Sequence, residues 1–381
     1  MDSAYLSPEH ELLREQVARF VAREVEPHAA QWERDGRVPR EVLRKMGAAG
    51  LLGLMFEPEY GGGGADALTN LVFAEALSQS TFGGFVITVL VHTDMAGPHL
   101  HHAGSAAQKA RWMPGITRGE LITAVGITEP GAGSDVAGLR TQARRDGDHW
   151  VINGSKLFIT NGVHADLYFI AARTGPAQRD ISIIAVEKGA PGFTVGRQLD
   201  KTGWRSSDTA ELHFDDCRVP AGQLLGQEGK GFYAVMKNFQ TERIALAAMA
   251  VGHCQQAIRL TLAHVKTRQA FGGTLWDQQA VRQRLAMCDA KTRAAREYAY
   301  HCAWRLTQVD RQGHDIVQDV SLLKALTGEL VNEVTQTCQQ FHGGMGYMTG
   351  TPVERLWRDA RVLAIGGGAT EVMLDEAAKR Y

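Results

Sequence analysis

The apolar pattern of this 381-residue chain changes its period twice, and this change restricts the possible folds more than any other feature. Residues 1–120 show helical spacing, residues 121–230 break into short strand-like runs, and residues 231–381 return to long helical segments. We therefore expect an α+β protein with three domains at these boundaries. The pattern predicts a small N-terminal helical domain, a middle barrel or sandwich, and a C-terminal antiparallel helix bundle.

Capping and turn residues mark the ends of the expected elements. Ser7 is a suitable N-cap and Pro8 a suitable first helical residue, while Gly50 ends a second helix. Turn dipeptides such as Asn153-Gly154 separate the strand-like runs. Further helices are expected over residues 40–49, 67–79, 232–265, 278–311 and 315–341, and strands over residues 150–153, 157–160, 167–171, 181–186, 193–195 and 210–214. No glycine-rich Rossmann fingerprint follows a strand, which argues against a nicotinamide-binding domain.

Charge and cysteine content exclude several classes of function. The 41 basic and 42 acidic residues nearly cancel, so no strong field favours nucleic acid or an anionic membrane. Five widely spaced cysteines without a CxxC pair argue for free thiols in a reducing compartment and against a disulfide framework or a metal site. The start of the chain lacks the basic and apolar segments of a secretory leader, and apolar runs such as residues 85–91 are too short to span a bilayer. We expect a cytoplasmic protein without a membrane segment.

The segment Ile127-Thr-Glu-Pro-Gly-Ala-Gly-Ser-Asp135 is the first motif that suggests a ligand. Its glycines allow backbone N–H groups to approach a bulky polar molecule closely, and two hydroxyls and two carboxylates stand beside them. A tight turn without a ligand has the same composition, so this segment alone does not decide between the two interpretations.

Further motifs along the chain resemble those of one family. They are Lys156-Leu-Phe-Ile-Thr-Asn-Gly162, Lys201-Thr-Gly-Trp-Arg-Ser-Ser-Asp208, Gln340-Phe-His-Gly-Gly-Met-Gly-Tyr347, Pro352-Val-Glu-Arg-Leu-Trp-Arg-Asp-Ala-Arg361 and Ile365-Gly-Gly-Gly-Ala-Thr-Glu371. Together with residues 127–135, and in this order, they resemble the acyl-CoA dehydrogenase family from end to end. The resemblance implies a helical N-terminal domain, a middle β-barrel, a C-terminal four-helix bundle and a homotetramer.

The resemblance also implies an activity and its partners. It implies an FAD enzyme that oxidises an acyl-CoA thioester to a trans-2-enoyl-CoA and passes electrons to an electron-transfer flavoprotein. By motif, the residues that contact FAD are Val125, Gly126, Ile127, Thr128, Ser134, Phe158, Ile159, Thr160, Arg268, Phe271, Gln279, Gln340, Gly343, Gly344, Thr370 and Glu371. Among these, Arg268, Phe271 and Gln279 look like residues that reach the FAD of a neighbouring subunit.

The catalytic base is the sharpest question that the sequence raises. Many relatives carry a glutamate at the position of Gly367, whereas the branch that includes isovaleryl-CoA and long-chain acyl-CoA dehydrogenases carries it at the position of Glu242. Phe239, Glu242, Leu246 and Met249 follow helical spacing, which places this carboxyl group on a largely apolar face. Burial raises the pKa of a carboxyl group, as a base for a weakly acidic α-proton requires. We expect Glu242 to be that base, although a first-turn surface glutamate is the alternative.

The acyl-CoA substrate is expected to contact Ser134, Tyr233, Arg243, Gly367 and Gly368. Gly366 and Gly367 replace bulkier residues of many relatives, so we expect a widened pocket for branched or bulky acyl groups. Two alternatives remain. One is a flavin oxidase of the same fold that reduces oxygen, and the other is a flavin-bearing member of this fold that associates with nucleic acid.

Overall fold

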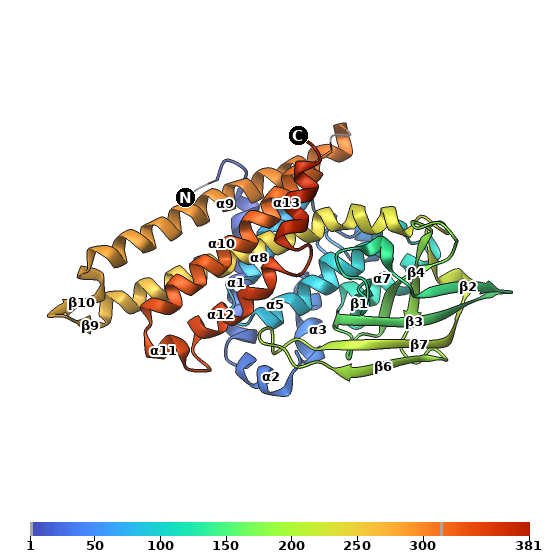
Figure 1. The fold of residues 1–381 in the computed structure, drawn as a ribbon, viewed down its shortest axis with the longest axis horizontal. Coiled ribbons are helices and arrows are strands. Elements are labelled where there is room, and N and C mark those ends of the chain that lie inside the picture. The colour runs from blue at the N-terminus through green and yellow to red at the C-terminus, as the bar shows by residue number, and fades with distance from the viewer. Residues whose placement is uncertain (1–2, 313–314) are drawn as a thin grey trace.

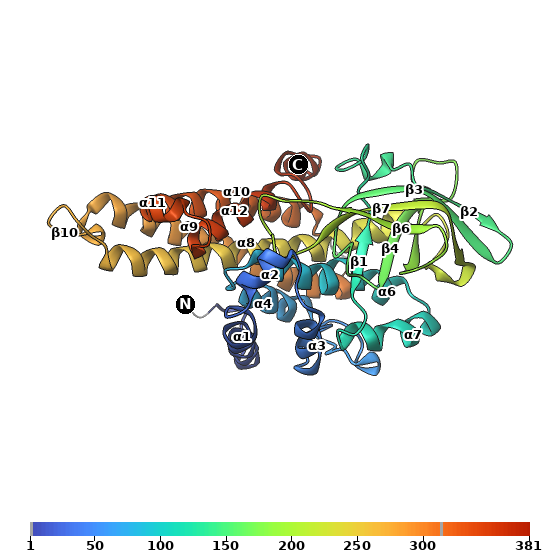
Figure 2. The same ribbon diagram turned by 90° about the horizontal axis from the view of Figure 1, so that it is seen from below.

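The computed structural model describes residues 3–312 and 315–381. The prediction that the chain starts without a secretory leader includes Met1 and Asp2, which lie outside the described residues. Helices occupy both ends of the chain and a sheet occupies its middle (Figure 1). The N-terminal helices lie against one side of the long C-terminal helices, and the sheet stands at one end of both (Figure 2). This order of helix, strand and helix confirms the α+β class.

The N-terminal part contains ten short helical elements. They are α1 (Pro8–Phe20), η1 (Val21–Val25), α2 (Ala29–Asp35), α3 (Arg40–Ala48), η2 (Pro58–Tyr60), α4 (Ala67–Leu77), α5 (Gly83–Leu90), η3 (Val91–Ala96), α6 (Gly97–Ala103) and α7 (Ala106–Thr117). Helix α1 begins after Ser7 with Pro8 as its first residue, as predicted. Asp66 caps α4 by accepting a hydrogen bond from the Thr69 N–H at 2.8 Å. Helix α4 is buried on nearly all sides because it packs against α1 and also against two helices of the C-terminal part.

The middle part is one eight-stranded sheet. Its strands are β1 (Thr123–Gly126), β2 (Gln142–Asp146), β3 (His149–Thr160), β4 (Leu167–Arg173), β5 (Ile181–Glu187), β6 (Phe193–Gln198), β7 (Thr209–Pro220) and β8 (Leu224–Leu225), joined by the short helices η4 (Val136–Gly138) and η5 (Ala221–Gln223). The order is β6-β7-β3-β2-β4-β5-β8, with β1 parallel to β4. Among the described residues the ladder begins at β6 and ends at β8, so the expected barrel is a single sheet without a closed ring of hydrogen bonds. The two short strands predicted over residues 150–160 form one strand, β3.

Three long antiparallel helices dominate the C-terminal part. The elements are α8 (Gly231–Thr267), β9 (Gln269–Ala270), β10 (Gly273–Thr274), η6 (Leu275–Asp277), α9 (Gln279–Gln312), α10 (Val317–Phe341), α11 (Gly344–Tyr347), α12 (Pro352–Ala360), η7 (Arg361–Ala364) and α13 (Thr370–Ala378). Helices α8, α9 and α10 pack against one another, and α12 and α13 pack on α10. Each long helix begins and ends within two residues of its predicted limits, because its apolar stripe covers its whole length.

A buried carboxylate joins the three parts of the molecule. Asp359 on α12 accepts hydrogen bonds from the N–H of Gly83 at 3.0 Å and from the N–H of Trp204 at 2.6 Å. Gly83 begins α5, and Trp204 lies between β6 and β7 with a φ of 51°. Arg358, which precedes Asp359 on α12, forms an ion pair with Glu33 of α2 at 2.7 Å. Because buried backbone N–H groups need partners, these contacts hold the N-terminal helices, the sheet and the C-terminal helices in one arrangement.

Within the described ranges 3–312 and 315–381, every helix is too short or too polar to cross a membrane.

Candidate active site

Glu242 lies on α8, inside the molecule. Its side chain is buried, as are those of Leu246 and Met249 on the same face of the helix. Burial raises the pKa of Glu242 to about 7, the nearby cations of Arg243 and Lys324 oppose this rise, and Asp94 reinforces it. At neutral pH the carboxyl group is therefore balanced between its acid and its base forms, as a proton acceptor for a weak carbon acid requires.

Gly367 lies directly beside this carboxyl group. A Cβ atom built at Gly367 would stand 3.5 Å from Glu242 Oε1, so the side chain of residue 242 reaches the region that a side chain at position 367 would enter. The same Cβ atom would stand 2.2 Å from Leu246 Cδ1, and the φ of Gly367 is 67°. Position 367 therefore accepts only glycine in this arrangement, for reasons of both space and backbone conformation.

The contact with Leu246 corrects part of the expectation about pocket size. Leu246 already fills the space next to Gly367, so the missing side chain there does not widen the pocket. At Gly366 the nearest atom to a built Cβ is 3.7 Å away, so space is available at this position. The widened pocket that we predicted from both glycines stays a prediction at Gly366, where a Cβ would fit.

Loop 127–135 is held in place by a buried ion pair. Lys156 Nζ on β3 donates to Glu129 Oε1 at 2.7 Å and to the carbonyl of Ile127 at 3.1 Å, and both charged side chains are buried. The Glu129 carboxylate also accepts hydrogen bonds from the N–H groups of Arg140 and Thr141 at 2.6 and 2.9 Å. A buried carboxylate with this many donors keeps its charge, and its pKa is lowered despite burial. The loop thus has a fixed shape before any ligand binds.

Residues 158–160 lie beside this loop, and one backbone hydrogen bond joins the two segments. The N–H of Leu157 donates to the carbonyl of Thr128 at 2.9 Å. Strand β3 is irregular between Lys156 and Ile159, and within this bulge Phe158 has a φ of 61° and is 63% exposed. Bulges change the direction of a side chain and often lie next to binding sites. A strained and exposed aromatic residue makes this surface a candidate binding site.

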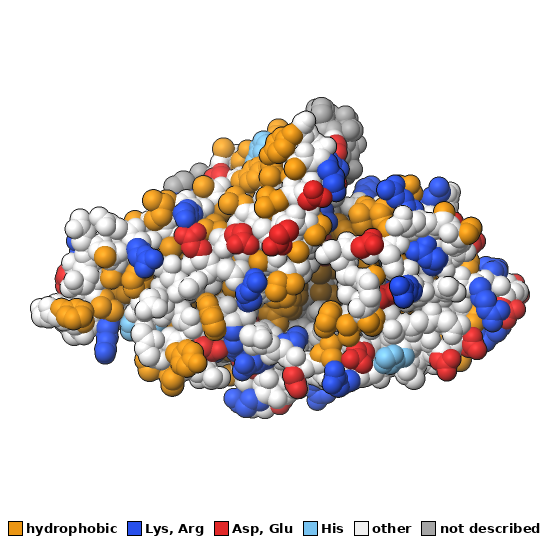
Figure 3. Space-filling model, in the orientation of Figure 1, with side chains coloured by type: hydrophobic (Ala, Val, Ile, Leu, Met, Phe, Trp, Pro, Cys, Tyr) orange, Lys and Arg blue, Asp and Glu red, His pale blue; other side chains and the backbone are white. Residues whose placement is uncertain are grey.

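Hydroxyl groups without partners lie on the same surface. Among the described residues, the side chains of Thr128, Ser134 and Thr160 make no hydrogen bond, and each is at least partly accessible. Open space stands over Gly131 and Gly133, where a built Cβ would meet no atom within 4 Å. Val125, Ile127 and Phe239 of α8 contact one apolar cluster, which brings the loop close to the helix that carries Glu242. Figure 3 shows the surface hollowed between the helices and the sheet.

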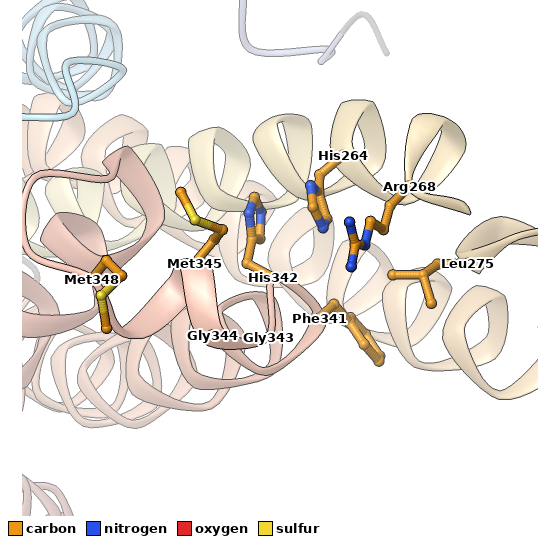
Figure 4. Close-up of a pocket in the computed structure, with 9 residues that line it drawn as sticks. All are labelled: His264, Arg268, Leu275, Phe341, His342, Gly343, Gly344, Met345 and Met348. Atoms are coloured by element: carbon orange, nitrogen blue, oxygen red, sulfur yellow. The ribbon is translucent and has the colours of Figure 1, made fainter. Parts of the chain in front are cut away.

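A second group of predicted cofactor residues lies at the far end of the bundle. A pocket of about 500 Å³ is lined by His264, Arg268, Leu275, Phe341, His342, Gly343, Gly344, Met345 and Met348. Figure 4 shows the side chains of His264, His342 and Arg268 beside one another, and the two imidazole rings stack at 4.2 Å between centroids. Phe271, at the turn between β9 and β10, is 90% exposed, and Gln279 and Gln340 are also exposed. These residues form a second surface with a cation, open glycine backbone and an exposed aromatic ring.

The two groups of predicted FAD residues do not meet within one chain. Arg268 directly follows the end of α8 and comes 26 positions after Glu242, which corresponds to roughly 39 Å along the helix axis. The β9–β10 turn and the sheet lie at opposite ends of the molecule (Figure 1).

The other predicted site residues, except Tyr233, lie near the loop that contains Gly367. Arg243 Nε donates to the carbonyl of Gly367 at 3.4 Å and its guanidinium lies over the Phe239 ring, so this side chain contacts protein atoms rather than open space. Gly368 has a φ of 111°. Thr370 Oγ1 donates to Glu329 at 2.9 Å, Glu371 is exposed, and Tyr233 near the start of α8 is 55% exposed.

Two features of the site were not found by sequence reasoning. One is the ion pair between Glu129 and Lys156. Each residue lies in a different recognised motif, and nothing in the sequence indicates that the two side chains are in contact. The other is Lys324 on α10, which is buried and donates to backbone carbonyls of the loop around Gly367. A lysine among Val320, Leu323 and Thr327 on one helical face is an available signal, because lysine is rarely buried without a partner.

Comparisons with known proteins agree with this arrangement. The models of the acyl-CoA dehydrogenase N-terminal, middle and C-terminal domains match residues 7–120, 124–217 and 229–381. The mitochondrial long-chain specific acyl-CoA dehydrogenase of Mus musculus is 40% identical over 380 residues, which cover 98% of this chain and 86% of that protein.

Solved structures agree along the whole chain. A putative acyl-CoA dehydrogenase from Mycobacterium smegmatis has a TM-score of 0.95 and 42% identity, with 99% of each chain covered. A glutaryl-CoA dehydrogenase from the same species, solved in complex with FADH2, has a TM-score of 0.92 and 27% identity, with 99% of this chain and 95% of that chain covered. Since three consecutive domain models and relatives of this identity span nearly the whole sequence, the chain belongs to the acyl-CoA dehydrogenase family.

Proposed function

We propose that this enzyme removes one hydrogen from each of the α and β carbons of an acyl-CoA thioester and gives a trans-2-enoyl-CoA, with Glu242 as the base for the α-proton. The observation that supports this most strongly is the pairing of Glu242 with Gly367. The carboxyl group is buried, its pKa is raised to about 7, and it points to the position where a side chain at residue 367 would lie. Placing the base on α8 leaves residue 367 free to act through its backbone.

Backbone N–H groups of the loop around Gly367 are suited to the thioester oxygen. As the α-proton leaves, negative charge develops on this oxygen, and donors already in place lower the barrier. The N–H of Gly367 makes no hydrogen bond to any described residue, so it is available for this contact. Glu242 lies close to Gly367, so the carboxyl group and this N–H can act on the α-carbon and on its thioester oxygen together.

The residues around loop 127–135 fit a flavin. The exposed Phe158 ring, the three hydroxyls without partners and the open space over Gly131 and Gly133 suit a planar molecule with many polar atoms. We propose that Val125 to Thr128, Ser134 and Phe158 to Thr160 hold the ring system and its pyrophosphate. FAD, when bound, accepts the hydrogen that leaves the β-carbon as hydride.

The distant pocket fits the opposite end of a cofactor that a neighbouring subunit holds. Arg268 offers a planar guanidinium for a phosphate, and the open backbone of Gly343 and Gly344 permits close approach. The roughly 39 Å between Glu242 and Arg268 supports this division between subunits. We propose a homotetramer for this reason.

For the substrate and the electron acceptor, we propose only a chemical class. The space at Gly366 supports a branched or bulky acyl group, and an electron-transfer flavoprotein is the proposed acceptor. Oxygen consumption that keeps pace with turnover would instead identify an oxidase, and a panel of straight and branched acyl-CoA esters would rank the acyl groups.

The variant Glu242→Gln tests the proposed base. The amide keeps the shape of the side chain but cannot take a proton, so reduction of bound FAD by acyl-CoA without oxygen should slow by about 10²-fold or more. The measurement is the loss of visible flavin absorbance after rapid mixing. The matched control is Glu333→Gln, an exposed glutamate on α10 paired with Lys291, which should reduce its flavin at the normal rate. Normal bleaching in Glu242→Gln, with FAD still bound, would overturn the assignment.

A further inference from the structure

Lys324 is a buried lysine that donates hydrogen bonds to the segment around Gly367. Its side chain projects from α10, and the residue is 2% exposed. The ammonium group donates to the carbonyl of Leu363 at 2.7 Å and to the carbonyl of Gly368 at 3.1 Å. These two carbonyls lie on either side of Gly367, so one side chain holds both ends of the segment that carries the proposed oxyanion donor.

This segment depends on such contacts for its shape. Gly367 and Gly368 have φ values of 67° and 111°, and the two glycines allow many other backbone conformations. Arg243 Nε adds a longer contact to the Gly367 carbonyl, at 3.4 Å. The Gly366 N–H also donates to the Val362 carbonyl at 2.8 Å, and Lys324 adds close side-chain hydrogen bonds at both ends of the glycine segment.

The charge of Lys324 also acts on the base. The ionisable groups that face Glu242 are Arg243 on α8, Lys324 on α10 and Asp94 on η3. Lys324 and Arg243 stabilise the carboxylate form, whereas Asp94, which is held by Asn70 and Thr93, disfavours it. Lys324 itself faces Arg243 and Glu242, and burial lowers its pKa to about 8. At neutral pH it carries a positive charge that acts on the proposed base without a direct ion pair between them.

We infer that Lys324 is a positioning residue for the reaction, which fixes the Gly367 N–H against the thioester oxygen and stabilises the carboxylate form of Glu242. This inference rests on the proposed function, because it assumes that Glu242 takes the proton and that the Gly367 N–H binds the oxygen. It explains why α10 has a lysine at a position where the surrounding residues are buried and mostly apolar.

The first test is Lys324→Met, which keeps the length of the side chain and removes its donors and charge. Displacement of a reacting group by about 1 Å costs on the order of 10²-fold, so we expect kcat/KM at high pH to fall by roughly tenfold or more. Loss of the cation should also move the rising limb of kcat/KM to higher pH, because the carboxylate form of Glu242 loses a stabilising charge. A folded variant that loses thermal stability but keeps both the wild-type maximum and the wild-type midpoint would overturn the inference.

Two companion variants and one control separate charge from burial. Lys324→Arg keeps the charge and the donors, so the pH midpoint of kcat/KM should not change. Lys324→Gln keeps only a neutral donor, so this midpoint should shift upward. The Gln variant also replaces the Met variant in the test if the Met variant does not fold. The control is Lys201→Met, which changes a partly buried lysine that donates to the Ser207 carbonyl at 2.5 Å and lies outside the site. Its midpoint should equal that of the wild type. A wild-type midpoint in Lys324→Gln would overturn the inference.

A binding measurement distinguishes failure of this inference from failure of the proposed function. A 3-ketoacyl-CoA loses its acidic α-proton easily and binds as an enolate without being oxidised, and its own ultraviolet absorption reports the enolate. The affinity should fall by roughly tenfold in Lys324→Met, because the negative oxygen loses a correctly placed donor. Unchanged enolate affinity in that variant overturns the role of Lys324, whereas normal flavin bleaching in Glu242→Gln overturns the base.

Discussion

At the scale of the single residue, the proposed base Glu242 owes its raised pKa to its surroundings. A glutamate in water titrates near 4.3, and removal from water disfavours its charged form. In this protein, burial raises the pKa of Glu242 to about 7, against the opposing charges of Arg243 and Lys324. The same residue on an exposed helix turn would be ionised at neutral pH but would be a much weaker base.

The pH dependence of kcat/KM follows from this pKa. Proton removal requires the ionised form, so kcat/KM should be low below the pKa of Glu242 and should rise with pH to a plateau, with a midpoint near 7. The free enzyme determines this midpoint, because kcat/KM reports its groups. The measurement is flavin reduction at limiting acyl-CoA across a pH series. A midpoint between 4 and 5, as for a solvated glutamate, would contradict the buried environment.

At the scale of the element, the loop that links η7 to α13 is as important for the proposed site as the helix that carries Glu242. Leu246 of α8 packs against Gly367, and Lys324 of α10 holds Leu363 and Gly368. The loop therefore takes its shape from two helices on different sides. Its own sequence, rich in glycine, would not maintain that shape alone.

Gly367→Ala should impair the enzyme through both space and strain. The new Cβ would lie 2.2 Å from Leu246 Cδ1 at a φ of 67°, so the loop or α8 must move. We expect a fall in kcat/KM of roughly 10²-fold, since the reacting groups lose their alignment. Gly189→Ala is the control, because Gly189 has a φ of 85° but no atom within 4 Å of a built Cβ. It should lower the melting temperature slightly without a change in rate. Equal rates for both variants would contradict the packing argument.

At the scale of the whole molecule, one chain carries two separate groups of proposed cofactor residues. The surface around Thr128 and Phe158 and the pocket around Arg268 lie at opposite ends of the molecule, which Asp359 helps to hold as one unit. If neighbouring subunits pair these surfaces, each complete site needs residues from two chains.

Subunit complementation tests this division. Glu242→Gln removes the base of a chain's own site, and Arg268→Glu should repel the phosphates of the partner's cofactor. After the two inactive variants are unfolded and refolded together, random pairing should leave roughly a quarter of the sites with neither change and restore a corresponding share of FAD reduction. Mixing without refolding is the control. Absence of recovery from hybrids that form would contradict sharing between subunits.

Much of the fold was predictable because periodicity is a local property of the chain. The start of α1 and the limits of α8, α9 and α10 follow from caps and apolar stripes within each segment. The join of two predicted strands into β3 was missed, because the turn signal at Asn153-Gly154 outweighed the pairing with β7 that keeps this strand continuous. Pairing partners lie far along the chain and leave no local mark.

For the site, the sequence by itself determined which residue types stand in which motifs, and so the family, the carboxyl group of Glu242 and the glycine at position 367. Only the tertiary structure decided how they meet. Arg243 and Gly367 are 124 positions apart, yet they touch, and Leu246 fills space that the sequence suggested was open. The contact between Lys324 and the Gly368 carbonyl joins α10 to the loop in the same way. Such contacts depend on how helices pack and on which buried polar groups need partners, and neither can be read from spacing along one segment.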